Sequence, residues 1–503
     1  MAVDYPKVMR TKSSGLTNSE SYLVQKCNST FLSFWSYPNL YKKQEKAKEL
    51  CDVLVIFKDH LFIFSDKTCS FGPSDDYLKE WKRWYKKAVS ASAKQIYGAE
   101  RWIKEYPERI CMDRQCNIDF PIKIEINENT RIHRIIVAHG AKQACMDHLH
   151  GSGSLRIDTT KTINDIQDIS QDSIFTVGKI NSAKGYIHIL DDITLDIIMS
   201  HLDTVMDFAE YLSRKEDWID CGNDIITNGE EDLLAYYLTN ADEMSNHCFT
   251  YIENEHRYIE ISERYWSKFI KSQEYKTKKQ LDKSSYVWDK LVEENLKHIM
   301  DGTSDYIGSP VKNDPSLYNF FVALTRFERR FLADRFFEHR DDKQRGFFRT
   351  RLVPPLRIGY PCYFFVVFDY ADLDFTIEDP IKYKMTLLSG YLKTLKLDYI
   401  HYSDFIGLIM STDPKDDNHL YIEHLDTKLW KEEDYKDAER IKQEYKQNGY
   451  WSAPTVTTIG ASEYKQLNSK GISIKKGRNR NKDCFCGSGR KYKRCCGSNT
   501  DRN

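Results

Sequence analysis

Hydrophobic positions near the start of the chain change their spacing twice. Between residues 13 and 35, apolar side chains recur at helical intervals behind serine and asparagine cap candidates. Two short apolar segments follow at 52–57 and 61–66, and the KDH stretch between them is typical of a tight β-hairpin. A long amphipathic stretch at 75–106, poor in helix breakers, predicts a second helix. The pattern therefore predicts helix, hairpin and helix in that order.

The rest of the chain mixes both kinds of spacing. Strands are predicted at 123–126, 134–140, 154–157, 175–180, 186–190, 361–370 and 404–412. Helices are predicted at 232–238, 259–273, 320–340, 386–397 and 428–446, and residues 192–300 are expected to be mostly helical. The fold class that follows is α/β, in a mixed α+β form. Because 503 residues are too many for one hydrophobic core, we expect several domains.

Composition indicates a soluble globular protein, with 41% apolar and 30% charged residues. The N-terminus lacks the apolar core of a secretion signal, and the longest apolar stretch, 363–368, has the length of a strand rather than of a membrane span. Most of the thirteen cysteines lie in apolar segments, as buried thiols do in a reducing compartment. We therefore expect a cytoplasmic protein without disulfides, in which Cys111 and Cys116 are thiols.

Four cysteines gather at the C-terminal end: Cys484, Cys486, Cys495 and Cys496. Four thiolates form the tetrahedral cage that Zn²⁺ prefers, and so short a segment needs the metal to supply its folding free energy. Between residues 465 and 496, eleven Lys or Arg stand against one acid. These cations favour the thiolates by lowering the pKa of cysteine. The preceding residues 451–482 have no core pattern and read as a basic tether, whose candidate nucleic-acid contacts are Lys475, Lys476, Arg478 and Arg480.

The segment CFCGSGRKYKRCC resembles the SEC-C motif, a family named from the C-terminus of the translocation ATPase SecA. Its pattern is Cys-x-Cys-Gly-Ser-Gly, an aromatic residue, and a closing Cys-Cys, and Tyr492 stands at the aromatic position. The resemblance implies a zinc knuckle that contacts a protein partner or nucleic acid. It covers only this segment, and the chain has no phosphate-binding P-loop, so a whole-chain match to SecA is excluded.

Acidic residues and a lysine mark the N-terminal helix and hairpin. Phosphodiester cleavage needs carboxylates that hold Mg²⁺, and a lysine that orients the attacking water assists it. Candidates that could meet around one cation are Glu20, Asp52, Ser65, Asp66 and Lys67. Alternation along a strand places Ser65 and Lys67 on one face and Asp66 on the other. The competing interpretation is an ordinary α/β hairpin with a surface ion pair.

The stretch KELCDVLVIFKDHLFIFSDK, residues 48–67, resembles the PD-(D/E)xK restriction-endonuclease-like superfamily. The resemblance implies Asp52 as the first acid, Lys67 as the signature lysine and Glu20 as a helical glutamate. Ser65 stands where the family usually places an acid, and Asp66 or Glu49 could compensate for it. The resemblance thus implies a nuclease, in which Glu20 and Asp52 ligate Mg²⁺ or Mn²⁺, Lys67 positions water, and Ser65 or adjacent backbone completes the site.

Two further patterns admit a functional and a plain structural interpretation. In 327–351 arginine alternates with phenylalanine, and Arg329, Arg330 and Arg335 could follow a phosphate backbone. On a helix, however, the phenylalanines would face the core and these arginines water, and this interpretation is favoured. A metal site or nucleophile at Cys145, His148 and His150, with His139 nearby, lacks a fourth ligand at typical spacing and is not favoured.

These observations predict six regions. They are a PD-(D/E)xK nuclease-like domain at 1–115, a mixed α/β region at 116–200, a mainly helical region at 201–310, an α/β region that could recognise nucleic acid at 311–450, the basic tether at 451–482 and the SEC-C zinc-binding motif at 483–497. No HExxH, GxSxG or GxGxxG motif supports zinc proteolysis, serine hydrolysis or Rossmann redox chemistry.

The expected function is metal-dependent hydrolysis of DNA, which is a likelier substrate than RNA. By fold-level analogy, this combination of domains suits a bacterial protein that defends its host against foreign DNA. Ser65 favours a rival hypothesis. In that hypothesis the protein is a non-catalytic adaptor, zinc and the basic tail dock a protein or nucleic-acid partner, and the nuclease-like fold is only a scaffold.

Overall fold

The chain forms a mixed α+β protein that divides into two compact units, Met1–Tyr275 and Lys276–Asn503. The computed structural model describes residues 12–241, 246–249, 258–301, 317–341, 348–368, 379–412, 420–451 and 463–464. The predicted mixed α+β class is therefore confirmed. The SEC-C cysteines lie outside the described residues, and so does the basic tether except for residues 451 and 463–464.

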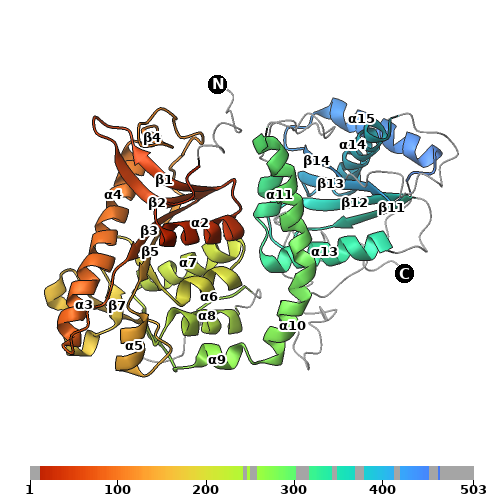
Figure 1. Ribbon diagram of the computed structural model, residues 1–503. Helices are drawn as coiled ribbons and strands as arrows, with labels where there is room; N and C mark the ends of the chain where they lie inside the picture. The colour runs from red at the N-terminus through yellow and green to blue at the C-terminus, as the bar shows by residue number, and fades with distance from the viewer. Residues whose placement is uncertain are drawn as a thin grey trace. The chain divides into compact units, whose positions relative to one another are not determined.

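A six-stranded sheet organises the first unit, with strand order β4-β1-β2-β3-β5-β8 (Figure 1). The strands β1, β2 and β3 form an antiparallel meander, whereas β3, β5 and β8 run parallel to one another. Their bounds are β1 Ser36–Lys42, β2 Lys48–Phe57, β3 His60–Thr68, β4 Ile110–Cys111, β5 Arg131–His139 and β8 Ile187–Asp191.

The predicted hairpin is the centre of this sheet. Phe57 pairs with His60, so only Lys58 and Asp59 form the connecting turn, and Lys58 has a positive φ of 51°. Two-residue turns with positive φ match the twist of antiparallel strands. The predicted order of helix, hairpin and helix is confirmed, with one strand, β1, inserted before the hairpin.

Helices cover both faces of the sheet. On one face Phe31 of α2 (Asn18–Phe31) stacks on Phe62 of β3 and meets Phe208 of α7 (Val205–Asp220). On the other face a helix formed by α3 (Tyr77–Tyr85), the π-helical turn η1 (Lys86–Ser90) and α4 (Ala91–Glu105) packs against β2, β3 and β5. Because side chains alternate along β3, neighbouring residues of this strand contact different helices.

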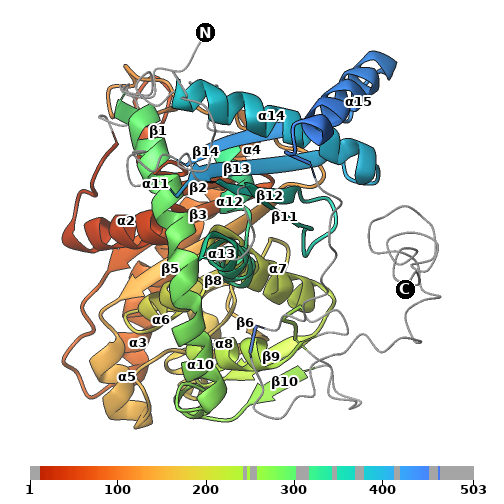
Figure 2. The same ribbon diagram turned by 90° about the vertical axis from the view of Figure 1, so that its right-hand side faces the viewer.

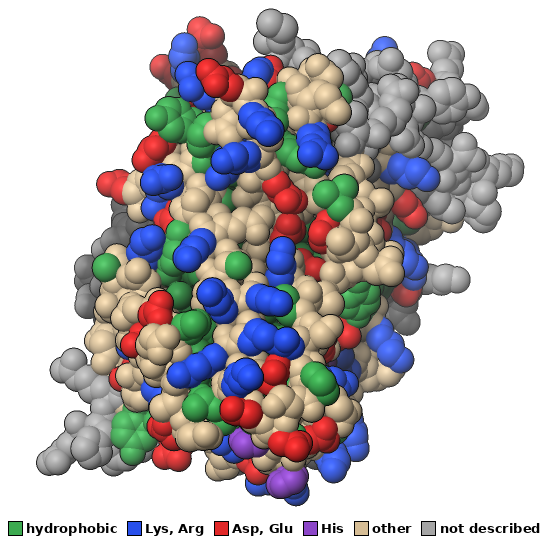
Figure 3. All heavy atoms as spheres, turned by 60° about the vertical axis from the view of Figure 1, so that its left-hand side comes forward, with side chains coloured by type: hydrophobic (Ala, Val, Ile, Leu, Met, Phe, Trp, Pro, Cys, Tyr) green, Lys and Arg blue, Asp and Glu red, His purple; other side chains and the backbone are tan. Residues whose placement is uncertain are grey.

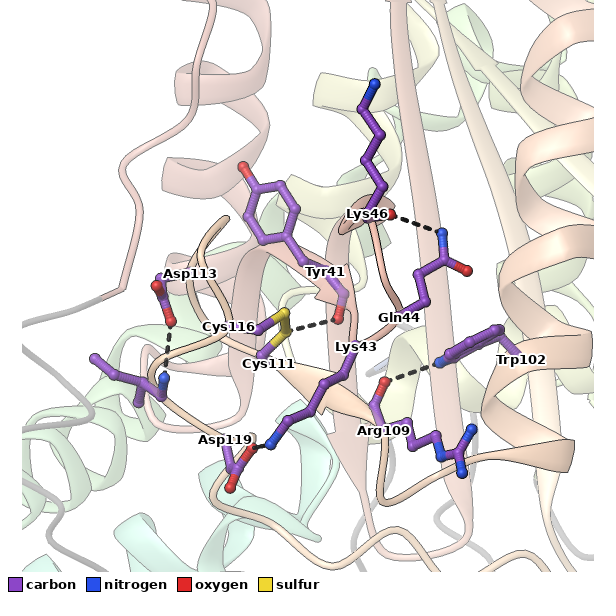
Figure 4. Close-up of a disulfide and its surroundings, with 11 residues drawn as sticks. Tyr41, Lys43, Gln44, Lys46, Trp102, Arg109, Cys111, Asp113, Cys116 and Asp119 are labelled. Carbon is purple, nitrogen blue, oxygen red and sulfur yellow. Dashed lines mark hydrogen bonds and ion pairs between the residues drawn. A yellow bond between two sulfur atoms is a disulfide. The ribbon is translucent and has the colours of Figure 1, made fainter.

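Cys111 and Cys116 form a disulfide, so the expectation of two thiols is wrong (Figure 4). A turn closed by the hydrogen bond from the amide of Cys116 to the carbonyl of Asp113 folds the chain back after β4. The two Cα atoms thereby lie 5.1 Å apart, within the range of disulfides. The other cysteines of the described residues are free.

A smaller sheet of order β10-β9-β6-β7 completes the first unit. Its strands are β6 Arg156–Thr162, β7 Thr176–Lys179, β9 Asp224–Thr227 and β10 Tyr258–Ile261, and the accompanying helices are α5 Lys142–Leu149, α6 Thr194–His201, α8 Glu230–Thr239 and α9 Tyr265–Phe269. The helix α10, Gln273–Leu281, begins in the first unit and ends in the second. Two predictions fail here. Residues 123–126 form no strand, and the helix predicted over 259–273 divides into β10 and α9, since alternate residues of β10 are buried beside β9.

The second unit contains a four-stranded sheet of order β11-β12-β13-β14, in which only β12 and β13 pair in parallel. Figure 2 shows α14 and α15 over one face of this sheet. Phe364 of β12 packs there with Leu388 and Tyr391 of α14, whereas Phe365 faces Trp288 and Phe336 on the other side. The bounds are α11 Tyr286–Asp301, α12 Tyr318–Val322, α13 Arg326–Asp341, β11 Phe348–Val353, β12 Cys362–Phe368, α14 Pro380–Asp398, β13 Asp404–Ser411, β14 Tyr421–Asp426 and α15 Glu432–Gln447.

The strands and helices predicted for the second unit are largely confirmed. The helix predicted over 320–340 is interrupted between α12 and α13, where Thr325 caps the second helix through the amide of Glu328. None of the helices in the described part of the chain has both the length and the apolar character needed to cross a bilayer.

Candidate functional site

The carboxyl ends of the parallel strands β3, β5 and β8 bring three titratable side chains together. Oδ1 of Asp66, on β3, lies 2.9 Å from Nε2 of His139 at the end of β5. Nδ1 of the same imidazole lies 2.9 Å from Oδ1 of Asp192, which follows β8. The amide of Gly140 donates to the second oxygen of Asp192 and fixes this carboxylate. His139 is therefore held between two acids.

These two acids keep the imidazole of His139 protonated at neutral pH. Burial lowers its pKa, but the hydrogen bonds and charges of Asp192 and Asp66 outweigh this effect and raise the pKa to about 9. Burial raises the pKa of Asp192, and the hydrogen bond from His139 reverses this and leaves the pKa lowered. An imidazolium that bonds two carboxylates orients both of them.

Asp52 lies beside Asp66 at the open end of the hairpin, away from the turn. The backbone amide of Asp66 donates to Oδ2 of Asp52 at 2.5 Å, and the Asp52 side chain is almost completely buried. Burial raises its pKa to about 8, because the hydrogen bond from Asp66 offsets only part of the desolvation and the charges of Glu49, Glu20 and Asp66 repel the ionised form. The protonated form of the Asp52 carboxyl is therefore favoured at neutral pH.

Glu20 is held near this pair but does not contact it. It stands in the first turn of α2, where Oε2 accepts from the amide of Leu16 at 2.8 Å and from Asn39 Nδ2 at 3.3 Å. The same Asn39 amide group donates to Oε1 of Glu49 at 3.4 Å. Glu20 and Glu49 thus share one neutral donor, and their charge reaches Asp52 through space.

Ser65 points away from Asp66. Its hydroxyl is fully buried and donates to Oε1 of Gln95 on α4 at 3.0 Å, on the opposite face of the sheet. Lys67 follows the buried residues of β3, and its side chain is exposed. It forms no hydrogen bond or ion pair with any residue that the structure describes. The structure thus brings Asp52 and Asp66 together, keeps Glu20 nearby, and places Ser65 in an internal contact.

His139 and Asp192 were missed as partners of Asp66. His139 ends an apolar strand and Asp192 follows one, and this position at a strand end was the feature of the sequence that could have marked them. Their proximity to Asp66 results from the parallel pairing of β3, β5 and β8, which the sequence pattern did not reveal. The grouping of His139 with Cys145 is not observed. The thiol of Cys145 donates to the carbonyl of Ser154, and burial raises its pKa to about 12.

His148 and His150 also lie apart from this group. The ring of His148 is 4.7 Å from that of Tyr77, and His150 adopts the left-handed conformation that ends α5. Among the residues that the structure describes, neither histidine forms a metal-binding group with Cys145.

Two arginines of α13, Arg329 and Arg330, are turned inward, so the expectation that they face water is wrong. Arg329 is 3% exposed and bonds Asp289, whereas Arg330 is 4% exposed and bonds Asp282 at 2.9 Å. The carboxylates of α11 and of the preceding turn attract these guanidinium groups into the interior. Arg335 is partly exposed and pairs with Glu338 at 2.6 Å.

The carboxylates of Asp52 and Asp66 are of the ligand type that Mg²⁺ accepts. Proteins commonly hold this cation through one or two carboxylates, with substrate phosphates and water completing its octahedron. Among the residues that the structure describes, no three His, Cys, Asp or Glu side chains are arranged as a complete metal cage. A cation at this pair would therefore depend on oxygen ligands from outside the protein.

Comparison with protein families identifies the C-terminal segment. Residues 480–498 match the family model of the SEC-C motif. The expected motif is thus confirmed in the sequence, although its cysteines lie outside the described residues. No significant match was found among curated proteins or among solved structures.

Proposed function

We propose that this protein is a Mg²⁺-dependent nuclease acting on DNA, with Asp52 and Asp66 as its cation-binding carboxylates. The observation that carries the proposal is the burial of Asp52 beside Asp66, which raises the pKa of Asp52 to about 8. Two adjacent acids that repel each other in a buried place have the charge that a divalent cation would balance. Bound Mg²⁺ would polarise the scissile phosphate and lower the pKa of a coordinated water.

The surrounding residues have separate roles in this proposal. His139 orients the carboxylate of Asp66 through its imidazolium, and Asp192 holds His139. Glu20 and Glu49 strengthen the negative potential at Asp52. Lys67 is exposed at the end of β3, and alternation puts it on the strand face of Ser65, so its role in this proposal is to attract a substrate phosphate at the edge of the sheet.

Cleavage of plasmid DNA and of RNA in the presence of Mg²⁺ or Mn²⁺ tests this proposal. We expect Asp52→Asn to reduce the rate at least about 100-fold, as expected when a metal-binding carboxylate is lost, and Lys67→Met to reduce it by a smaller factor. Asp59→Asn is the matched control, because Asp59 is exposed in the turn of the same hairpin. Cleavage that survives both Asp52→Asn and Lys67→Met would exclude the site.

A second candidate is a zinc-dependent adaptor, favoured by the match of residues 480–498 to the SEC-C motif. In this hypothesis Cys484, Cys486, Cys495 and Cys496 hold Zn²⁺ and present a basic knuckle to a protein or nucleic acid. The internal hydrogen bond of Ser65 agrees with it, because that position lacks the usual acid. An absence of cleavage with every substrate and metal, together with zinc-dependent partner binding, would favour the adaptor.

A further inference from the structure

One continuous helix, α3–η1–α4, presents a stripe of positive charge. Its inner face is apolar and buried against the large sheet, with Trp81, Trp84, Ile96 and Ile103 each at most 1% exposed. Its outer face carries lysines and arginines at helical intervals. The basic residues between Tyr77 and Glu105 are Lys79, Lys82, Arg83, Lys86, Lys87, Lys94, Arg101 and Lys104.

No acid is exposed between Lys79 and Lys104. This stretch contains two acids, Glu80 and Glu100, and both are at least nine-tenths buried. Glu80 pairs with Arg83 at 2.9 Å, and Glu100 pairs with Arg134 of the neighbouring strand β5 and with Lys104. The two acids therefore neutralise Arg83, Lys104 and Arg134, and the other cations of the stripe keep their positive charge.

Most of the stripe has no partner. Six of its cations form no ion pair with any residue in the described ranges, namely Lys79, Lys82, Lys86, Lys87, Lys94 and Arg101. Figure 3 shows lysine and arginine side chains gathered over α3 and α4 on this face of the molecule. Such unpaired, like-charged side chains repel one another and favour a polyanion.

We propose that this stripe binds the phosphate backbone of a nucleic-acid duplex. Lys79 and Lys104 lie about 38 Å apart at the rise of a helix, comparable to the roughly 34 Å turn of B-DNA. That the polyanion is a nucleic acid rests on the proposed nuclease function, whereas the presence of a polyanion-binding surface does not. It assigns the substrate contact to α3 and α4 and not to the arginines of α13.

The surface chemistry favours a duplex over a membrane or a single strand. A membrane-surface helix inserts an apolar face, and the apolar face of this helix is already packed on the sheet. Single strands stack their bases on open aromatic rings. Two rings of this helix, Tyr97 and Trp102, are only partly exposed, and each has a lysine close to its face: Lys184 lies 4.4 Å from the centre of Tyr97 and Lys42 lies 5.8 Å from that of Trp102.

The test measures binding of a fluorescent DNA duplex to the full-length protein in EDTA at several salt concentrations. We expect Lys86→Gln/Lys87→Gln/Lys94→Gln to weaken binding at least 10-fold and to reduce the slope of log K against log salt by up to about 3. The matched control is Lys268→Gln/Lys271→Gln/Lys276→Gln, at three exposed positions on and near α9 and α10. We expect this control to bind like the wild type, and circular dichroism verifies that both variants are folded.

Equal affinity and slope in the two triple variants would overturn the proposal. Tighter binding of single-stranded DNA than of duplex, or preferential binding of polyglutamate or anionic vesicles through the same lysines, would also overturn it. Equal binding of an RNA duplex would support recognition of the phosphate backbone. Because EDTA prevents cleavage, lysine-dependent binding by a protein that never cleaves DNA would reject the nuclease and keep the binding surface.

Discussion

The backbone amide of Asp66 donates a hydrogen bond of 2.5 Å to the carboxylate of Asp52. This contact joins the two strands of the hairpin, and both acids are buried. One hydrogen bond does not offset the burial of Asp52, whose pKa rises to about 8. The charge of this pair therefore depends on pH.

Asp52 should make the protein less stable as pH rises. Its folded pKa, about 8, exceeds the ordinary value of 3.8, so the folded state binds the proton more tightly between these values. The free energy of unfolding then falls by up to about 1.4 kcal/mol per pH unit in that window. Asp52→Asn should flatten the decline between pH 5 and 8, as measured by urea unfolding. An unchanged pH dependence would contradict the raised pKa.

Mg²⁺ should stabilise the protein more at high pH than at low pH. A cation binds ionised Asp52, and protons compete with it below a pKa of about 8. We expect the Mg²⁺-induced rise in Tm to be larger at pH 8.5 than at pH 6, and to be lost in Asp52→Asn. Asp59→Asn should keep the full rise, and an equal rise in all three proteins would place the cation elsewhere.

His139 should contribute stability below neutral pH. Its folded pKa is raised from 6.5 to about 9 by Asp192 and Asp66, so the contribution is complete below pH 6.5 and disappears as pH rises through 9. We expect His139→Gln to cost about 2 kcal/mol at pH 6 and much less at pH 9.5. Calorimetry at both pH values measures this difference, and a cost independent of pH would argue for packing alone.

Ser65 should be structural. Ser65→Ala removes the hydrogen bond to Gln95 and should lower the free energy of unfolding by about 1 kcal/mol without reducing cleavage. Ser65→Glu, which installs the acid usual for the PD-(D/E)xK family, should destabilise more strongly because the position is fully buried. A large loss of cleavage in stable Ser65→Ala would return this residue to the site.

Arg330 should stabilise the second unit. Its guanidinium bonds Asp282, and both residues are almost completely buried, so Arg330→Ala leaves an uncompensated charge and should cost about 3–5 kcal/mol. Arg335→Ala, which breaks a partly exposed pair with Glu338, should cost less than about 1 kcal/mol. Affinity for duplex DNA should be unchanged in folded Arg330→Ala, and a specific loss of binding would contradict this interpretation.

Local patterns predicted the local structure well. The hairpin of β2 and β3 follows from two apolar segments and a short polar turn, and the helix at 75–106 follows from its amphipathic spacing. β1 was missed because Pro38 and Asn39, whose φ is positive, interrupt its strand pattern. β10 was read as a helix because its strand character depends on pairing with β9, which lies earlier in the chain.

The candidate site needed contacts that a local pattern does not contain. Alternation placed Ser65 and Asp66 on opposite faces, and their hydrogen bonds to Gln95 and His139 agree with that prediction. The union of Asp66 with His139 depends on the parallel pairing of β3 and β5, which joins residues 73 positions apart. The inward arginines of α13 similarly depend on Asp282 and Asp289, whose position no periodicity reveals.

The most direct test of the central claim is a Mn²⁺ anomalous difference map from crystals of the protein grown with a DNA duplex at pH 8. We predict a peak within bonding distance of carboxylate oxygens of both Asp52 and Asp66, and its loss in Asp52→Asn. A map with Mn²⁺ bound elsewhere on the protein and no density at these two carboxylates would contradict the account.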